Sequence, residues 1–205
     1  RINEFKKKKR THNYNKKIIF LSLGRYHKKK NFEILVSAYE KLIKENFKFK
    51  AIIAGSKMDS IENLVKKKGI DSVVKVLNIE KQIKNVNQIP NNEVFKLYRN
   101  ADCFVMTSRI ESFGIVTIEA MAFGLPILAA NSPGNIDILA NGKFGIIYDN
   151  SEKDLLRKLK FILKSKKKDD LSRKSLERAK IYDWSVIVDK YINLYYQLIK
   201  KRSYD

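Results

Sequence analysis

The chain has 205 residues, of which 44% are hydrophobic and 11% aromatic, and a formal net charge of +21. This composition excludes a disordered protein, and the length allows one good core, or one domain with an appendage. Cys103 is the single cysteine, which excludes an internal disulfide and a cysteine-based metal cluster, and two histidines are too few for a histidine-rich metal site. We therefore expect no bound metal ion.

The large positive charge has three interpretations. It is typical of nucleic-acid binding, of attraction to an anionic membrane surface, or of a lysine-rich composition spread along the whole chain. The third is favoured because lysines recur in nearly every block of ten residues, and contact with acidic lipid is then a secondary effect. No apolar run approaches the length of a membrane span, and IIFLSL (18–23) is too short for a signal peptide. We expect a cytoplasmic protein, with peripheral attachment to the inner face of the membrane as a variant of that location.

Residues 1–16 (RINEFKKKKRTHNYNK) are basic and polar and have no apolar period. Such a segment is typical of an interdomain linker or of a frayed start. The chain also begins with Arg1 rather than Met, so we expect it to be a piece of a longer protein or a processed product.

The first strand is predicted at residues 17–24 (KIIFLSLG), followed by the loop RYHKKKN and a helix. Gly24 permits a tight turn, and Arg25 and Lys30 project from the loop at the carboxyl end of the strand, beside a helix that Asn31 could cap. Cations at this place can neutralise a diphosphate. For this loop taken alone, a solvated basic segment is still the stronger interpretation.

Strands and helices then alternate. Further strands are predicted at residues 47–55, 73–77, 102–107 and 126–130, with helices at 58–68 and 91–100; after residue 149 only helices follow, at 153–165, 171–180 and 184–200. This order predicts an α/β protein with a Rossmann-like, doubly wound parallel sheet, helices on both faces and a C-terminal helical tail. We divide the chain into a Rossmann-like domain at 17–165 and C-terminal helices at 166–205. Trp184 and a stripe of apolar residues in the last helix are interpreted as packing residues, the stripe being Tyr191, Leu194, Tyr195 and Leu198.

The stretch from Ser108 to Pro126 places one carboxylate in a loop and a second inside a helix. Glu111 follows a predicted strand, in the type of connection where open α/β sheets hold their ligands. Ser112 is a candidate N-cap. Gly114 lets a ligand approach the backbone, and the first-turn N–H groups favour an anion such as a phosphate.

The second carboxylate, Glu119, shares a helix face with Ile115, Ile118 and Ala122. A carboxylate on an apolar stripe is costly to bury unless something hydrogen-bonds to it or pairs with it, which indicates a polar ligand. Taken alone, Glu119 would more often be a partly exposed residue paired with a lysine, and Glu111 a solvated loop residue. Together, the two acids flanking an anion-receptive helix start favour a ligand that carries both hydroxyls and phosphates.

The segment ESFGIVTIEAMAFGLP (111–126) resembles the donor-site signature of the retaining family 4 glycosyltransferases, also described as glycosyl transferases group 1, which have the GT-B fold. In that family two glutamates separated by seven residues frame E-(G/S)-F-G and E-A-M-A-x-G-x-P. The resemblance extends over residues 17–200. It implies the carboxyl-terminal, donor-binding half of such an enzyme, so that 17–165 would be a nucleotide-sugar-binding domain and 166–205 would pack on it and towards a missing N-terminal acceptor domain.

The resemblance implies a reaction as well. A hexosyl group would pass from a nucleoside diphosphate sugar, UDP- or GDP-linked, to a glycan or lipid-linked acceptor, with retention of configuration and without a metal or other cofactor. The setting would be cell-surface polysaccharide or glycoconjugate biosynthesis, and the isolated half would be inactive. Nucleic acid would not be a partner.

The family's residue roles carry over to matching positions. Gly24 and Arg25 match its G-R turn, and Arg25 and Lys30 would contact the diphosphate; Lys30 is preferred over Lys28 and Lys29 because it directly precedes the helix. The start of the helix, at Phe113, Gly114 and Ile115, would donate backbone N–H groups. Glu111 would be the catalytic carboxylate that accepts from sugar hydroxyls, and Glu119 would accept from the ribose.

Two departures from the family pattern leave the base open. A single glycine, Gly55, stands where the family usually has a glycine-rich pair, and a polar loop at residues 78–88 could surround the nucleobase. Two other classes of function stay as alternatives: a nucleotide-sugar-binding domain without activity of its own, and a basic nucleic-acid-binding protein, which leaves Glu111 and Glu119 unexplained. A phosphorylase or epimerase on the same fold ranks lower.

Overall fold

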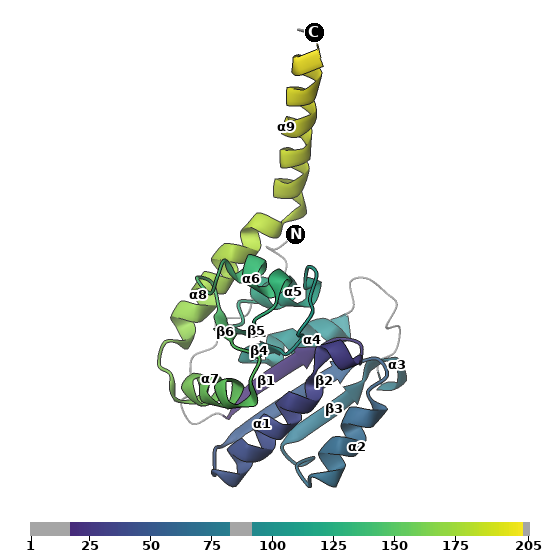
Figure 1. Cartoon of the computed structure of the whole chain (residues 1–205), viewed down its shortest axis with the longest axis vertical. Coiled ribbons are helices and arrows are strands. Elements are labelled where there is room, and N and C mark those ends of the chain that lie inside the picture. Colours follow the sequence, from purple (N-terminus) through teal and green to yellow (C-terminus); the bar gives the residue numbers. More distant parts are fainter. Residues whose placement is uncertain (1–16, 83–91, 203–205) are drawn as a thin grey trace.

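The computed structural model describes residues 17–82 and 92–202. These residues form a parallel sheet of six strands in the order β3-β2-β1-β4-β5-β6 (Figure 1). The strands are β1 (Ile18–Leu23), β2 (Phe49–Gly55), β3 (Val74–Asn78), β4 (Cys103–Met106), β5 (Ile127–Ala130) and β6 (Ile146–Tyr148). The predicted linker at 1–16 and most of the polar loop at 78–88 lie outside the described residues.

Helices connect the strands and extend beyond the last of them. They are the short η2 (Lys28–Lys30), α1 (Phe32–Lys44), α2 (Asp59–Lys67), α3 (Ile79–Gln82), α4 (Asn92–Asn100), α5 (Ile115–Ala122), α6 (Pro133–Leu139), α7 (Glu152–Lys164), α8 (Lys168–Ala179), the short η3 (Lys180–Tyr182) and α9 (Trp184–Arg202). The predicted helices and strands are therefore all present, with boundaries that differ by a few residues.

Two hydrophobic cores lie on opposite faces of the sheet. Successive strand residues point to opposite faces, so Phe20 belongs to the core under α1, α2 and α7, whereas Leu21 belongs to the core under α4, α5, α6 and α8. Because both faces are covered, the strands read as continuous apolar runs, as expected for a parallel sheet. The predicted doubly wound, Rossmann-like fold is confirmed.

Helix α1 illustrates how the pattern forms the first core. Leu35, Ala38, Tyr39 and Leu42 recur at three- and four-residue intervals and are all buried. The ring of Tyr39 packs against two aromatic rings from the sheet, with centroid distances of 5.8 and 5.3 Å, to Phe20 and Phe49 respectively. Cys103 is fully buried in this core, as predicted for an inert side chain.

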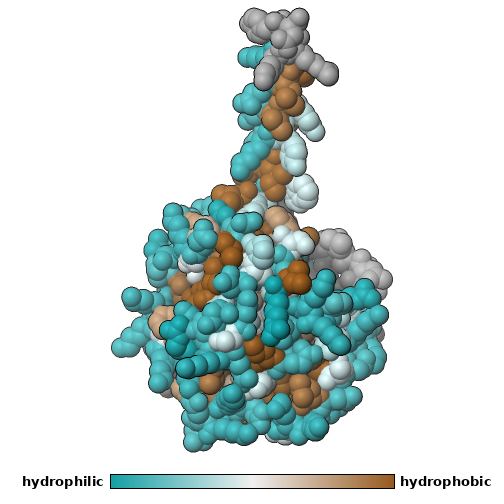
Figure 2. Space-filling model, viewed as in Figure 1, coloured by the Kyte–Doolittle hydropathy of each residue, from teal (hydrophilic) through white to brown (hydrophobic). Residues whose placement is uncertain are grey.

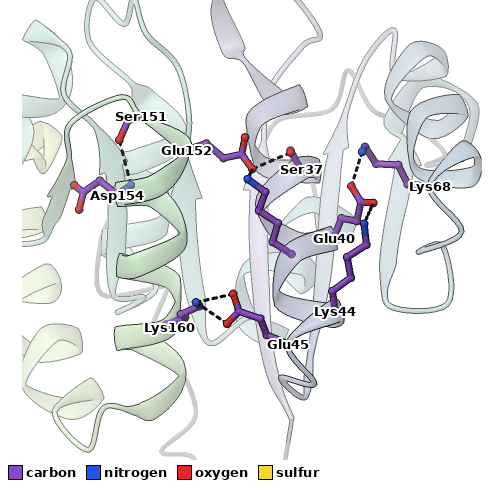
Figure 3. Close-up of polar contacts among 10 residues, drawn as sticks. Ser37, Glu40, Lys44, Glu45, Lys68, Ser151, Glu152, Asp154 and Lys160 are labelled. Atoms are coloured by element: carbon purple, nitrogen blue, oxygen red, sulfur yellow. Dashed lines mark hydrogen bonds and ion pairs between the residues drawn. The ribbon is translucent and has the colours of Figure 1, made fainter.

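Ion pairs attach α1 to its neighbours at the surface of that face (Figure 3). Glu152 at the start of α7 accepts from the hydroxyl of Ser37 at 2.9 Å, and Lys160, further along α7, pairs with Glu45 just after α1. On the other side, Glu40 accepts hydrogen bonds from Lys44 and Lys68, which lower the pKa of its carboxyl to about 2. Surface contacts of this kind stabilise the fold only slightly; those of Glu152 and Lys160 join α7 to α1, and that of Lys68 joins the end of α2 to α1.

The direction in which the chain adds strands to the sheet reverses between β1 and β4. The chain runs outward from β1 to β2 and β3, then returns to place β4 on the other side of β1, where Phe20 is opposite Cys103. The loops after β1 and β4 therefore leave the same edge of the sheet side by side. Open α/β sheets bind ligands at such a switch point, outside the carboxyl ends of the strands.

The C-terminal helices differ in how they pack. Helix α8 lies against α5, where the hydroxyl of Ser172 donates to the carbonyl of Gly124. Helix α9 extends away from the body of the molecule (Figure 1), and apolar residues are visible along its length in Figure 2. Trp184 and Tyr195 are 76% and 59% exposed. Trp184 and the stripe of Tyr191, Leu194, Tyr195 and Leu198 were interpreted as packing residues, but in the described part of this chain each of them is about half exposed or more, so none belongs to its cores.

Candidate functional site

Two loops at the switch point are joined by backbone and side-chain hydrogen bonds. The N–H of Arg109 donates to the carbonyl of Lys29 at 2.9 Å, and the hydroxyl of Thr107 donates to the carbonyl of Lys30 at 2.7 Å. These contacts attach the loop after β4 to η2, which follows β1. They fix the distance between side chains that are about eighty positions apart in sequence.

The result is an ion pair between two predicted site residues. Nζ of Lys30 lies 2.6 Å from Oε2 of Glu111, and the two side chains are only 24% and 13% exposed. Lys28 and Lys29 are exposed, as is Arg25. Of the three lysines in the loop, Lys30 is therefore the one that lies beside Glu111, and the predicted contact with a diphosphate remains a prediction.

The turn after β1 is built by a close backbone approach. Gly24 donates its N–H to the carbonyl of Ala54 at 3.0 Å, and its own carbonyl oxygen would lie 1.8 Å from a Cβ placed on Gly55. Only glycine fits at residue 55, so Gly55, which stands where the family usually has a glycine-rich pair, is the residue that allows the turn after β1 to approach the end of β2. Asn31 occupies the N-cap position of α1 with a left-handed φ of 52°, but its side chain makes no capping hydrogen bond, so the predicted cap is wrong.

The second loop ends at Gly114, which is the N-cap residue of α5 with φ of 68°. Ser112 was predicted as the N-cap, and this is wrong because the helix begins two residues later than that cap would require, after a residue whose positive φ favours glycine. The N–H of Gly134, at the start of α6, donates to the carbonyl of Glu111 at 3.0 Å, and a Cβ on Gly134 would lie 2.4 Å from that oxygen. Sequence reasoning missed Gly134; a Pro-Gly pair after β5 was the available signal.

Phe113 and Ile115 lie on the surface on either side of Gly114, with exposures of 52% and 64%. The ring of Phe113 meets that of Tyr182 in η3 edge to face, with centroids 6.0 Å apart. On α5 the fully buried side chains are Thr117, Ala120 and Met121. The helix face that carries Ile115, Ile118, Glu119 and Ala122 is therefore partly exposed to solvent. It is not the face that packs on the core.

Glu119 is partly buried on α5 and has a partner inside the protein. The hydroxyl of Tyr98, on α4, donates to Oε2 of Glu119 at 2.7 Å. Burial raises the pKa of the Glu119 carboxyl, and the hydrogen bond from Tyr98 partly opposes that rise. Among the described residues the partner of Glu119 is thus a tyrosine and not a lysine, and Tyr98 is a contact that the sequence did not indicate.

Together these residues place a compensated cation, two carboxylates and a helix start at one edge of the sheet. The N–H groups of Ile115 and Val116 precede the first hydrogen bond of α5, which Thr117 donates to the carbonyl of Gly114 at 2.8 Å, and N–H groups in such positions are suited to an anion. Carboxylates accept from hydroxyls. Across residues 17–82 and 92–202, no three side chains among His, Cys, Asp and Glu gather where they could hold a metal ion. In the same residues no helix has both the length and the hydropathy needed to cross a membrane.

The chain is similar to known proteins both in sequence and in structure. A probable sucrose-phosphate synthase from Thermosipho melanesiensis is 30% identical over 190 residues, which are 87% of this chain and 41% of that protein. The solved sucrose-phosphate synthase from Thermosynechococcus elongatus has a TM-score of 0.75 at 24% identity, over 90% of this chain and 46% of its own. Anabaena HepE, solved in complex with UDP and glucose, has a TM-score of 0.73 at 18% identity, over 96% of this chain and 54% of its own.

The chain thus spans about half the length of the relatives it matches, and its fold is one Rossmann-like half of a GT-B glycosyltransferase. A family model described as glycosyl transferases group 1 matches residues 3–180, which is most of the sequence. The chain belongs to the glycosyl transferases group 1 family.

Proposed function

We propose that the chain is the donor-binding half of a retaining glycosyltransferase, which transfers a hexosyl group from a nucleoside diphosphate sugar to a glycan or lipid-linked acceptor. The observation that carries this proposal is the Lys30–Glu111 pair, 2.6 Å apart at the switch point of the sheet and beside the start of α5. A donor of this kind carries a diphosphate and many hydroxyls. The cation of Lys30 suits the diphosphate, and the carboxylate of Glu111 suits the hydroxyls.

Lys30 and Arg25 act on the diphosphate in this proposal. As the bond to the sugar breaks, negative charge grows on the departing nucleoside diphosphate, and fixed cations stabilise that charge. Lys30 is the better placed of the two, because its partly buried position strengthens its interaction with an anion. The backbone N–H groups at Gly114 and Ile115 add donors that need no rearrangement when the charge develops.

Glu111 and Glu119 act on the two sugars of the donor. Glu111 accepts from hydroxyls of the transferred hexose and stabilises the positive character that develops on its ring. Glu119 accepts from the ribose hydroxyls. A diphosphate would compete with Glu111 for Lys30, so donor binding frees Glu111 for the hexose.

UDP is the first nucleotide to test, because HepE was solved with UDP and glucose. Calorimetric titrations of the chain with UDP, GDP and ADP, and with their hexose conjugates, are compared with titrations of Glu119→Ala. We expect one nucleotide to bind saturably and to lose most of its affinity in the variant. Absence of binding by all of them at about 1 mM, where only ~4 kcal/mol is needed, would overturn the proposal. Salt-sensitive binding of DNA in its place would favour the nucleic-acid alternative.

Turnover tests the catalytic role of Glu111 in the chain joined to its acceptor-binding domain. Glu111→Ala should lower kcat by about a hundredfold or more, because a charge that stabilises the transition state is lost. The control is Asp71→Ala, which removes an exposed carboxylate from the turn before β3, at the opposite edge of the sheet from the site, and should leave kcat unchanged. Near-normal turnover in Glu111→Ala would remove Glu111 from the catalytic role, and binding without any transfer in the unaltered enzyme would favour a donor-binding domain without activity.

A further inference from the structure

Tyr98 connects two helices through its hydroxyl. It lies in α4 and is completely buried, and its hydroxyl donates to Oε2 of Glu119 in α5 at 2.7 Å. A second acceptor, the carbonyl of Val116, lies 3.3 Å away. The hydroxyl has one proton, and the shorter contact to an ionised acceptor is the stronger hydrogen bond. The carboxylate of Glu119 is therefore the main acceptor.

The ring of Tyr98 is held on two sides by other aromatic rings. It stacks on Phe123, with centroids 5.2 Å apart and planes 11° from parallel, and it packs against Phe104 of β4 at 6.1 Å. A ring packed in this way has a fixed orientation, so its hydroxyl points in a fixed direction. The contact with Glu119 thus comes from a rigid donor and not from a side chain that adjusts to its partner.

A rigid donor on one oxygen determines where the rest of the carboxylate points. A carboxylate can accept about four hydrogen bonds, and Tyr98 uses one of them on Oε2. The other positions, including those on Oε1, stay available for a ligand that carries adjacent hydroxyls. Pre-orientation of this kind reduces the entropy lost on binding.

We propose that Tyr98 is a positioning residue for donor binding: its hydroxyl holds Oε2 of Glu119 so that the remaining lone pairs of the carboxylate face the ribose hydroxyls of a nucleoside diphosphate. This inference rests on the proposed function, since it needs a nucleotide at the site. Tyr98 itself does not touch the nucleotide. It acts through Glu119, and the effect of removing its hydroxyl must therefore depend on Glu119 being present.

The test is a double-mutant cycle measured by calorimetric titration of the chain with UDP, or with GDP where that is the nucleotide the chain binds. Tyr98→Phe keeps the packed ring and should weaken binding about tenfold. In the Glu119→Ala background the same change should alter affinity by less than about twofold, because the group it positions is gone. With the 2′,3′-dideoxy form of the nucleotide, Tyr98→Phe should likewise have almost no effect.

Tyr39→Phe is the matched control, because it removes a hydroxyl from a buried tyrosine in the core on the other face of the sheet. It should leave nucleotide affinity unchanged in every background. An equal loss from Tyr98→Phe with and without Glu119, or with and without ribose hydroxyls, would overturn the positioning role while leaving the proposed function intact. Failure of the unaltered chain to bind any nucleotide would overturn both.

Discussion

At the scale of single residues, the site contains a carboxylate that the fold tolerates at a cost. Burial raises the pKa of Glu119, so the folded protein favours its protonated form more than the unfolded chain does. A raised carboxyl pKa contributes stability that is fully present below the unfolded pKa and is lost as pH rises through the folded pKa. The ionised form of Glu119 therefore contributes a lower free energy of unfolding than the protonated form does. Such a residue is expected where function needs the charge.

Glu119→Gln should accordingly stabilise the chain at pH 7, by roughly 0.5–1 kcal/mol, because an amide carries no charge to bury and can still accept from Tyr98. The gain should shrink as pH falls and the wild-type carboxyl becomes protonated. Urea unfolding at pH 7 and at pH 4 measures both effects. The exposed Glu80→Gln provides the control for the change in net charge. A gain that is the same at both pH values would contradict this account.

Gly55 is a residue whose missing side chain has a large effect. A Cβ at this position would lie 1.8 Å from the carbonyl oxygen of Gly24, which is backbone and cannot move aside. Gly55→Ala should lower the free energy of unfolding by about 3 kcal/mol. Gly69→Ala is the comparison, since its Cβ would meet nothing within 4 Å and only its φ of 64° is unfavourable, at a cost of about 1 kcal/mol. Chemical denaturation of both variants measures these losses in the free energy of unfolding. Equal losses in the two variants would contradict the prediction.

Some residue contacts could be predicted from the sequence and others could not. The neighbourhood of Lys30 and Glu111 follows from a general rule, because both come directly after strands that end at the same edge of a parallel sheet. The Tyr98–Glu119 bond and the close approach at Gly55 join side chains or backbones of different elements, and periodicity within one element contains no information on such contacts. The N-cap at Ser112 was wrong for a related reason: the helix start is set by the left-handed Gly114 and by its packing on α6.

At the scale of elements, one arginine joins α8 to α6. Arg178 donates through Nε to the carbonyl of Ile138 at 2.8 Å and through an Nη to that of Asp137 at 2.7 Å, both in the last turn of α6. Its guanidinium also lies 5.4 Å from the ring centroids of Phe144 and Tyr182. The last carbonyls of a helix lack the N–H donors of a following turn and attract cations, so Arg178 caps α6 from a different helix, although the carbonyl of Asp137 also accepts from the N–H of Ala140.

Arg178→Lys should therefore destabilise the chain by about 1–2 kcal/mol, because a single ammonium cannot make both hydrogen bonds and stack on two rings. Arg173→Lys, at an exposed residue of the same helix that pairs with Asp170, should change stability by less than about 0.5 kcal/mol. Thermal and urea unfolding of the two variants give the comparison. Equal stability of the Arg178 and Arg173 variants would show that the contacts of Arg178 do not hold α8 against α6.

The order and type of the elements were predictable because each has its own hydrophobic period. The amphipathic α1 and the continuous apolar strands carry the pattern that their burial requires. The pattern of α9 is equally clear, yet it identifies only that a face is apolar and not what covers it. This is why Trp184 and Tyr195 were interpreted as packed, whereas they are exposed in this chain.

At the scale of the whole molecule, α9 presents a large apolar surface to solvent. Tyr191, Leu194, Tyr195 and Leu198 are each about half exposed, and contiguous exposed apolar surface of this kind marks an interaction site or promotes association. In the proposed donor-binding role, an acceptor-binding domain would be the partner that covers this face. The chain alone should associate through it.

Sedimentation velocity across a wide range of protein concentrations tests this association. Replacing Tyr191 and Tyr195 with serine should shift the chain towards monomer, since it removes two exposed aromatic side chains that lie 6.4 Å apart by ring centroids. Replacing Asn193 and Gln197, polar residues of the same helix, with serine should leave association unchanged and controls for the loss of helix propensity. A chain that remains monomeric at every concentration would contradict the prediction.

The position of the Lys30–Glu111 pair also has a consequence for how the molecule folds. The two residues are 81 positions apart, and they meet only where β1 and β4 join the two halves of the sheet. Closing a loop of that length costs entropy before any contact compensates for it. Neither half of the sheet can form the pair alone, so Lys30 and Glu111 come together only when β1 has paired with β4. Nucleotide affinity would therefore appear late in refolding and report on whether the two halves of the sheet have joined.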